Sequence, residues 1–281
     1  MMDLHCHTAA SDGQYSPVQL IKLAKKTGIT VLAITDHDTV DSLWQGELSA
    51  KESRIRFIPG IEINAQGKNV HILGYNINYK SSATQDICAA NKQMRRKRAK
   101  MIFDYLADKN IYLTWADIEK YAPGGIFARP HFARAMIEQG YISTVSEAFE
   151  RYLDTEEFRK IKRPRPTAEE AIKMIETMSG IPVLAHPALQ KKSDKEIEAL
   201  IVHLKNTGLA GIECYHSEHS KNDIEKYLAF AHKYDLLITG GSDFHGEKIK
   251  PSIKLGTGIN NNLNFHDEKL IENLQKFKSW N

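Results

Sequence analysis

Histidines and carboxylic acids of the kind that bind divalent metals recur along this chain. His5 and His7 bracket a single residue, and Asp36 and His37 are adjacent. Similar residues are spread through the rest of the sequence at Asp12, Glu62, His71, His186, Asp243 and His245. Any one of them alone is more often a hydrogen-bonded structural side chain than a metal ligand.

If these side chains lie together in the folded protein, they could bind metal ions. Burying unpaired titratable groups costs several kcal/mol for each group, so a buried cluster of them needs a compensating charge. Divalent cations supply that charge, and a mixture of imidazole and carboxylate ligands suits manganese, iron or zinc. The set therefore predicts a metal centre, provided that the chain folds so that its members converge.

Short apolar runs predict the strands that would carry these residues. They span residues 2–6, 30–35, 55–63, 70–75, 181–185, 209–214 and 236–239. Helical patterns separate most of them, including one that opens at Pro17, where the missing N–H has no helical partner to lose. Strands that alternate with helices favour an α/β fold with a mainly parallel sheet, either open or closed into a barrel.

Nearly every predicted strand has an imidazole or a carboxylate at its C-terminal end or in the loop that follows. His5 and His7 end the first strand, and the alternation of a strand directs both imidazoles to the same side. Asp243 and His245 follow the last strand. Because sites in parallel α/β folds are assembled at that edge of the sheet, we expect the whole set to meet there.

The middle of the chain changes to mostly helical patterns and predicts a helical insertion. We expect a metal-binding barrel made of residues 1–80 and 166–281, with residues 81–165 as a cap. After the insertion, Thr167 and Glu170 have the spacing of a capping box, and a last helix is predicted over residues 267–277. The insertion also contains a basic run, most of which we expect to be a solvated helix face: Arg95, Arg96, Lys97, Arg98 and Lys100.

The composition is that of an ordinary globular protein. The chain has 281 residues, of which 42% are hydrophobic and 26% charged, and its net charge of +3 is too small to indicate a general nucleic-acid surface. Cys6, Cys88 and Cys214 have no paired spacing, which argues against a disulfide framework or a zinc ribbon. With no signal-like N-terminus and no apolar stretch near the roughly 20 residues of a membrane span, we expect a cytoplasmic protein without a membrane partner.

The motifs around these residues resemble those of the PHP (polymerase and histidinol phosphatase) family, in the family's order. They are residues 3–8 (DLHCHT) with 11–13 (SDG), 34–38 (ITDHD), 59–62 (PGIE), 71–74 (HILG), 184–187 (LAHP) and 241–246 (GSDFHG). The insertion is similar to that of the stand-alone bacterial branch related to nucleoside 3′,5′-bisphosphate and AMP phosphatases, at residues 129–131 (RPH) and 147–149 (EAF). The chain then departs from the usual aromatic-valine segment of that branch and reads FRKIKRPR over residues 158–165.

The resemblance implies a distorted seven-stranded (β/α) TIM-like barrel with two or three divalent metals, Mn²⁺ and iron foremost and Zn²⁺ as an alternative. Transferred motif by motif, one metal would be bound by His5, His7, Glu62 and Asp243. A second metal would share Glu62 and use His71 and His186. A third metal would be bound by Asp12, His37 and His245.

The leading hypothesis is hydrolysis of a phosphomonoester of a small nucleotide by a metal-bridging hydroxide. Arg129 and His131 begin a predicted helix and, on the resemblance, would hold a substrate phosphate, with a surface salt bridge as the alternative for the arginine. Within the basic run, Arg95 or Arg98 could point into the site and bind a second phosphate, rather than lie on the solvated face of the helix. These four residues are therefore predicted to bind substrate.

Two further side chains are candidates for catalytic roles. Asp36 could accept a hydrogen bond from a ligand imidazole and orient it, with helix capping or turn formation as the alternative. His216 follows a predicted strand and could protonate the leaving oxygen or contact substrate, with hydrogen-bonded support of the site as the alternative.

Two other classes of function stay open. The same metals could serve a 5′-to-3′ exonuclease acting on short RNA or DNA, and activity that falls steeply with salt would favour that reading. A non-catalytic, metal-stabilised regulatory module is the third possibility. The expected partners are a small phosphorylated nucleotide or a short oligonucleotide, without a stable nucleic-acid complex.

Overall fold

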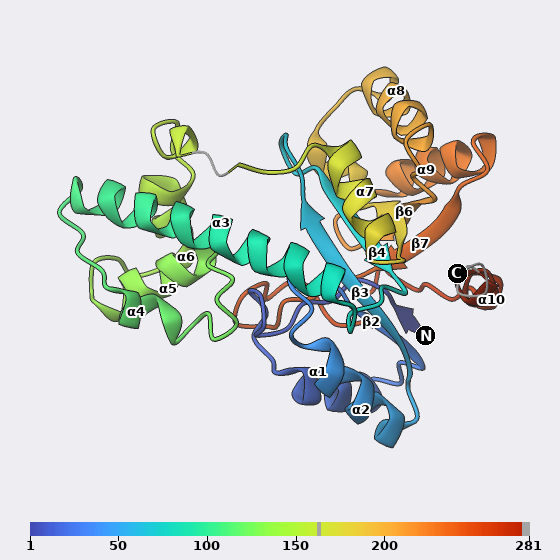
Figure 1. Cartoon of the computed structure of the whole chain (residues 1–281), viewed down its shortest axis with the longest axis horizontal. Coiled ribbons are helices and arrows are strands. Elements are labelled where there is room, and N and C mark those ends of the chain that lie inside the picture. Colours follow the sequence, from blue (N-terminus) through green and yellow to red (C-terminus); the bar gives the residue numbers. More distant parts are fainter. Residues whose placement is uncertain (162–163, 277–281) are drawn as a thin grey trace.

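Seven strands form one sheet that is nearly closed into a barrel in the computed structural model, which describes residues 1–161 and 164–276 (Figure 1). In chain order the strands are β1 (Met2–Asp3), β2 (Val31–Ile34), β3 (Arg56–Asn64), β4 (His71–Tyr75), β5 (Ile181–Leu184), β6 (Gly211–His216) and β7 (Leu237–Gly241). The sheet follows the same order, and the first and last strands meet where Leu4 N–H donates to the Gly240 carbonyl at 3.1 Å. The predicted α/β barrel is confirmed.

A glycine makes this closure possible. At Gly241 a Cβ atom would lie 2.4 Å from both the backbone nitrogen and the Cβ of His5, closer than any real side chain allows. The segments that follow β1 and β7 therefore approach each other backbone to backbone. Asp243 N–H then donates to the His5 carbonyl at 2.8 Å, which ties the segment after β7 to the first histidine of the candidate set.

β4 is the one strand of the described sheet that runs against its neighbours. It pairs antiparallel with both β3 and β5, whereas the other pairings are parallel. A short connection without a helix joins β3 to β4, which only an antiparallel pair permits. The reversal puts the first residue of β4, His71, at the edge where the parallel strands end.

Helices cover the outside of the barrel. They are α1 (Pro17–Lys26), α2 (Leu43–Ser53), α7 (Ala168–Thr177), α8 (Asp194–Lys205) and α9 (Lys221–Lys233). The last helix, α10 (Glu268–Lys276), packs against the other face of the strands, because Leu270 and Leu274 share a core cluster with Met2. The predicted capping box begins α7, because Thr167 Oγ1 accepts from Glu170 N–H and the Glu170 carboxylate accepts from Thr167 N–H. Phe277, the predicted end of the last helix, lies outside the described residues. None of the described helices is long and apolar enough to cross a bilayer.

The middle of the chain builds a second hydrophobic core beside the barrel. It contains α3 (Ser82–Ala107), α4 (Trp115–Glu119), α5 (Arg129–Glu138) and α6 (Val145–Ala148), which lie to one side of the barrel in Figure 1. Ile102, Phe132 and Met136 are among its buried side chains. Cys88, near the start of α3, packs instead into the barrel core, so this long helix joins the two cores. The domain boundaries at residues 80–81 and 165–166 stay a prediction.

Candidate metal centre

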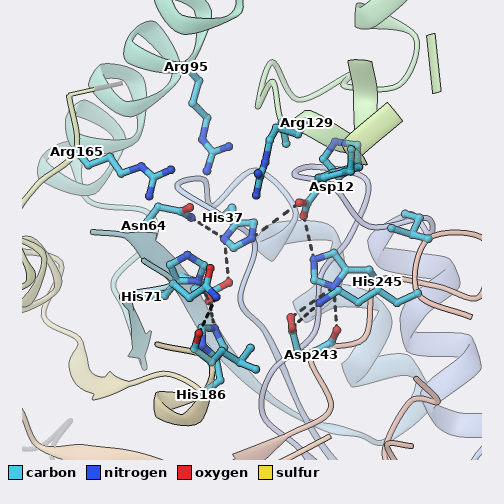
Figure 2. Close-up of a pocket in the computed structure, with 18 of the residues that line it drawn as sticks. Asp12, His37, Asn64, His71, Arg95, Arg129, Arg165, His186, Asp243 and His245 are labelled. Carbon is cyan, nitrogen blue, oxygen red and sulfur yellow. Dashed lines mark hydrogen bonds and ion pairs between the residues drawn. The ribbon is translucent and has the colours of Figure 1, made fainter. Parts of the chain in front are cut away.

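All nine predicted ligands lie at one mouth of the barrel, where they form groups of facing side chains. Figure 2 labels Asp12, His37, His71, His186, Asp243 and His245. Each of the nine is buried or nearly so, because it projects from a strand end or from the tight loop after it. Glu62 lies inside β3, where it pairs with Leu73 of the reversed strand, and its side chain is 1% exposed. Its carboxylate is at the centre of the group.

Glu62 faces five histidines with its two oxygens. Oε1 lies 2.7 Å from His71 Nδ1 and 3.0 Å from His186 Nε2. Oε2 lies 3.3 Å from the Nε2 atoms of both His5 and His7, and 2.9 Å from His37 Nδ1. A carboxylate with both oxygens among imidazoles has the arrangement of a ligand that bridges two cations.

Asp243 completes the group around the first two histidines. Its Oδ1 lies 3.2 Å from His7 Nε2 and 3.6 Å from His5 Nε2. The same two imidazole nitrogens therefore face one oxygen of Glu62 and one oxygen of Asp243. The expected alignment of His5 and His7 on one side of the chain is present, although β1 itself ends at Asp3.

A third group gathers around Asp12, in the loop after β1. Its Oδ1 lies 3.3 Å from His245 Nε2 and 3.8 Å from His7 Nδ1, and its Oδ2 lies 3.9 Å from His37 Nε2. Hydrogen bonds to the Nδ1 atoms of His245 and His37 determine which ring nitrogen faces Asp12. His245 Nδ1 donates to the Asp243 carbonyl at 2.8 Å, and the Asn64 amide donates to His37 Nδ1 at 2.9 Å. In each ring Nε2 is left facing Asp12.

The donor set fits divalent cations. Buried atoms without a hydrogen-bond partner in the described chain include His5 Nε2, both ring nitrogens of His7, Glu62 Oε2 and His186 Nδ1. Leaving such atoms buried and unsatisfied costs about 1–3 kcal/mol each. These unsatisfied atoms lie close together, so one bound cation would be coordinated by several of them at once.

The pKa values of the group reflect burial and mutual charge. Burial opposes protonation of His7, but contacts with Asp243 and Glu62 raise its pKa to about 9. Burial lowers the pKa of His71 to about 4, and burial with the nearby Lys250 ammonium lowers that of His245 to about 4. Burial would raise the pKa of the Glu62 carboxyl, but the surrounding imidazoles hold it well below its ordinary value. Burial and the neighbouring charges thus separate the pKa of His7 from those of His71 and His245.

Two of the candidate ligands have an unfavourable backbone conformation. Asp243 has φ 57° and His186 has φ 25°, in a region that residues with a side chain rarely adopt. Such a conformation costs about 1–3 kcal/mol for each residue and persists only where surrounding contacts enforce it. Backbone strain at these positions is typical of a functional site.

The expectation that Asp36 orients an imidazole is wrong in this structure. Its carboxylate accepts hydrogen bonds from the backbone and hydroxyl of Thr8 (2.7 and 2.6 Å) and from the hydroxyls of Ser11 and Ser42 (2.5 Å each). These donors reach the carboxylate first, because the loop after β1 folds over the end of β2. Asp36 therefore fixes the loop that carries Asp12 and contacts no candidate ligand ring.

Glu213 of β6 has the role that was expected of Asp36. This carboxylate is fully buried and accepts from His5 Nδ1 at 2.9 Å and from the His186 backbone N–H at 2.8 Å. It fixes the orientation of the His5 ring and leaves Nε2 facing Glu62 and Asp243. In the sequence Glu213 is an acid near the end of the predicted strand over residues 209–214, and it belongs to none of the recognised motifs.

Replacing Glu213 by Gln should weaken metal binding by roughly 10- to 100-fold, the usual effect of losing a partner that orients a ligand. Gln keeps the shape but loses the charge, and it cannot accept equally well from both donors. Competition with a chromophoric chelator measures the affinity, and the exposed Glu225 on α9, changed to Gln, is the matched control. Equal affinities of the two variants would contradict the assigned role.

His216 is buried beside His5 and Glu213, and its role as proton donor to the leaving group stays a prediction. Its side chain is 0% exposed, Nδ1 accepts from Glu218 N–H at 3.1 Å, and Nε2 lies 3.7 Å from Asp243 Oδ2. β6 continues to His216, two residues beyond its predicted end, so the ring lies inside the barrel beneath the cluster. The alternative, hydrogen-bonded support of the site, agrees better with this position.

A cavity of about 280 Å³ opens over the cluster. Asp12 and His245 lie on one side of the cavity, and Arg95, Arg129 and Arg165 face them from the other side (Figure 2). Glu62 and Arg98 also line the cavity. Asp38 accepts from Arg95 Nε at 2.8 Å and from Nη2 at 2.5 Å, which directs that guanidinium over the mouth. The expected positions of Arg95, Arg98 and Arg129 at the site are thus observed.

Arg129 has the position expected of a phosphate-binding residue and also forms the salt bridge expected as the alternative, so its role stays a prediction. It lines the cavity, pairs with Asp154 at 2.9 Å and places its guanidinium carbon 5.2 Å from the centre of the Phe149 ring. His131 does not reach the cavity wall and is fully buried. Its Nδ1 accepts from Ala128 N–H at 3.1 Å and caps α5, and its contact with substrate stays a prediction.

Arg165 is a cavity residue that the sequence did not indicate. It lies at the end of the segment that departs from the bacterial branch, of which residues 162 and 163 lie outside the described residues. Its Nη1 donates to the Ala65 carbonyl at 3.4 Å. Burial lowers the pKa of its guanidinium from the ordinary value, and the neighbouring Arg95 adds to this effect.

Comparison with known proteins agrees with this geometry. The PHP domain model matches residues 3–177. The chain is 34% identical over 245 residues to a 5′-3′ exoribonuclease of Haemophilus influenzae, covering 86% of this chain and 89% of that protein. It is 29% identical over 252 residues to a 3′,5′-nucleoside bisphosphate phosphatase of Chromobacterium violaceum, covering 87% of each.

Two solved structures share the fold over most of their length. A Bifidobacterium adolescentis protein assigned to the metal-dependent phosphoesterases superposes with a TM-score of 0.84 at 29% identity, covering 98% of this chain and 96% of the other. An amidohydrolase from Chromobacterium violaceum, solved with bound sulfate and no metal, gives a TM-score of 0.80 at 28% identity and covers 88% and 89%. With its ligand-type residues gathered at one barrel mouth, the chain belongs to the PHP domain family and is a hydrolase of the metal-dependent phosphoesterase type.

Proposed function

We propose that this chain is a phosphatase of small nucleotides, which hydrolyses a phosphomonoester of a nucleoside 3′,5′-bisphosphate or of AMP. The two-walled cavity is the observation that carries the proposal. One wall holds the candidate metal ligands and the other holds arginines, so one phosphoryl group can lie at each wall. A volume of about 280 Å³ lies at the lower limit of the ligand-pocket range of about 300–1,000 Å³, which suits a single nucleotide.

The nine clustered residues would hold two or three divalent metals, with manganese and iron as the candidates and zinc as an alternative. When bound, such metals lower the pKa of coordinated water and offset the charge that develops on the phosphoryl group. The chain itself fixes the geometry. Asp36 fixes the Asp12 loop, Glu213 fixes His5, and Glu62 lies among histidines from both halves of the barrel.

The arginines would bind the phosphate that is not hydrolysed. Arg95 is held by Asp38, whereas within residues 1–161 and 164–276 the guanidinium of Arg165 donates to the Ala65 carbonyl at 3.4 Å and keeps further donors for a ligand. Guanidinium groups bind phosphate oxygens through paired, charge-assisted hydrogen bonds. The sulfate bound to the related Chromobacterium violaceum structure supports an affinity of this fold for tetrahedral anions.

A phosphate-release assay on the manganese-supplemented protein tests this function. The substrates are nucleoside monophosphates, nucleoside 3′,5′-bisphosphates and 5′-phosphorylated short oligonucleotides. We expect inorganic phosphate from the bisphosphates or from AMP. If the metal-loaded protein released no product from any of these substrates, the proposal would fail.

A 5′-to-3′ exonuclease on short RNA is the second candidate, because relatives 33–34% identical to this chain are 5′-3′ exoribonucleases. The same two walls could bind a terminal 5′-phosphate and the next phosphodiester, with the rest of the strand outside the cavity. The products distinguish the two functions, because an exonuclease releases mononucleotides and a phosphatase releases inorganic phosphate. An exonuclease should also lose activity with salt more steeply.

Replacing Arg165 by Gln should lower kcat/KM for a 3′,5′-bisphosphate by about 10- to 100-fold, the effect of one lost charge-assisted hydrogen bond. Hydrolysis of p-nitrophenyl phosphate, which has no second phosphate, should change by less than about threefold, within the uncertainty of a surface substitution. The comparison of the two substrates is the measurement. Arg159→Gln is the matched control, since Arg159 is 64% exposed and pairs with Asp154. Equal losses on both substrates would contradict a second-phosphate site.

A further inference from the structure

Lys250 is a cation of the cavity that belongs to neither the ligand set nor the arginine wall. It lies in the loop after β7, lines the cavity and places Nζ 2.6 Å from Asp243 Oδ2. Its side chain is 33% exposed, whereas that of Asp243 is 8% exposed. The ammonium therefore lies at the boundary between the buried cluster and the open cavity.

Hydrogen bonds fix the backbone of the loop that carries Lys250 and so restrict the position of its side chain beside Asp243. Ile249 N–H and Lys250 N–H both donate to the Gly246 carbonyl, at 3.0 and 2.9 Å, and Ile253 N–H donates to the Lys250 carbonyl at 3.1 Å. Gln14 also accepts from Lys248 N–H at 2.9 Å and ties the loop to the segment after β1. A lysine on such a braced turn loses less conformational freedom on binding a ligand than one on an open loop.

The two oxygens of Asp243 serve different neighbours. Oδ1 faces His7 Nε2 at 3.2 Å and His5 Nε2 at 3.6 Å, the side on which a metal would lie. Oδ2 faces Lys250, with His216 Nε2 at 3.7 Å. A cation held by the two histidines and Oδ1 would therefore leave the contact between Lys250 and Oδ2 in place.

An ammonium group has three N–H donors, and the described residues supply one acceptor for Lys250, the Asp243 carboxylate. The remaining donors lie beside the candidate metal ligands and can face the cavity. An anion seated against the cluster would be the natural acceptor, because charge-assisted hydrogen bonds to phosphoryl oxygens are strong.

We propose that Lys250 is a catalytic residue that binds the phosphoryl group undergoing hydrolysis. This inference rests on the proposed function. During hydrolysis a water oxygen bonds to phosphorus, the ester P–O bond breaks with its electron pair going to the leaving oxygen, and the proton lost by water balances that charge. Lys250 keeps its own proton throughout and donates a hydrogen bond to a non-bridging phosphoryl oxygen. The arginines of the opposite wall bind the other phosphate.

Calorimetric titration of the manganese-loaded protein with inorganic phosphate tests the contact without turnover. Lys250→Met keeps the length of the side chain and removes its charge, and it should weaken phosphate binding by roughly 10- to 100-fold. The kcat/KM for p-nitrophenyl phosphate should fall by a similar factor. Lys250→Arg keeps the charge and should recover most of both losses. Elemental analysis of all variants should give the wild-type metal content.

Lys248→Met, on the exposed part of the same loop, is the matched control and should bind phosphate like the wild type. Wild-type phosphate affinity in Lys250→Met would overturn the proposal. So would a loss of metal content in Lys250→Met that accounts for the weaker binding, because Lys250 would then act only on Asp243. If the wild type binds phosphate yet hydrolyses no ester, the proposed function fails, while the phosphate-binding comparison still decides the contact of Lys250.

Discussion

Replacing Glu62 by Gln should lower turnover by roughly a thousandfold, at the upper end of the effect of removing one electrostatic group from an active site. The Glu62 carboxylate lies within 3.3 Å of ring nitrogens from His5, His7, His37, His71 and His186. Gln keeps the volume but replaces one acceptor oxygen by a donor NH₂ group and removes the negative charge. The site would then lack the negatively charged side chain that its histidines share, so the metal content should fall with the activity.

Elemental analysis and phosphate release on the same samples measure both effects of the Glu62 change. Glu47→Gln is the matched control, because Glu47 accepts from the Tyr79 hydroxyl on another face of the barrel and its side chain is 48% exposed. Circular dichroism verifies that Glu62→Gln is folded. A variant with full metal content and full turnover would remove Glu62 from the ligand set.

Removing the metals should abolish hydrolysis and lower the thermal stability of the protein. The centre buries imidazole nitrogens and carboxylate oxygens without hydrogen-bond partners among the described residues, and burying them costs free energy. Cations would offset this cost only in the folded chain, where the ligands lie together. Metal at 100 times its dissociation constant stabilises the folded state by about 2.7 kcal/mol. For a chain of this size that corresponds to a Tm shift of roughly 5 °C.

Dialysis against a strong chelator, followed by removal of the chelator, prepares the metal-free protein for this test. Calorimetry before and after the addition of Mn²⁺ gives the Tm shift, and phosphate release from a bisphosphate gives the activity. Both should return with Mn²⁺, while Mg²⁺, which prefers oxygen ligands, should restore less. Undiminished hydrolysis by protein shown to be metal-free would rule out a metal-dependent reaction.

The sequence by itself determined the class of fold and the residues that meet at the barrel mouth. Strand alternation placed His5 and His7 on one side, and the parallel arrangement brought strand ends from both halves of the chain to one edge. These inferences depend on local periodicity and on a rule of topology, and both can be read from residue order. The reversal of β4 was not predicted, but it kept His71 at the mouth, because an antiparallel strand begins where its parallel neighbours end.

The contacts around the ligands were decided only by the tertiary structure. Asp36 and Glu213 are both acids at predicted strands, yet one accepts from loop hydroxyls and the other from His5. Which acid reaches an imidazole depends on how the loop after β1 folds over β2, to within about an ångström. The alternation of a strand gives the side of the sheet that a residue faces and carries no information on that distance.

The cations of the cavity show the same limit. The basic run on α3 predicted Arg95 and Arg98, but Arg165 and Lys250 come from irregular segments whose spacing has no period. Their positions depend on long-range contacts, such as the donation from Arg165 to Ala65 and the ion pair of Lys250 with Asp243. The sequence determined the ligands because they lie in strands, at strand ends or in the loops that follow them, whereas Arg165 and Lys250 lie in irregular segments whose positions only the folded chain decided.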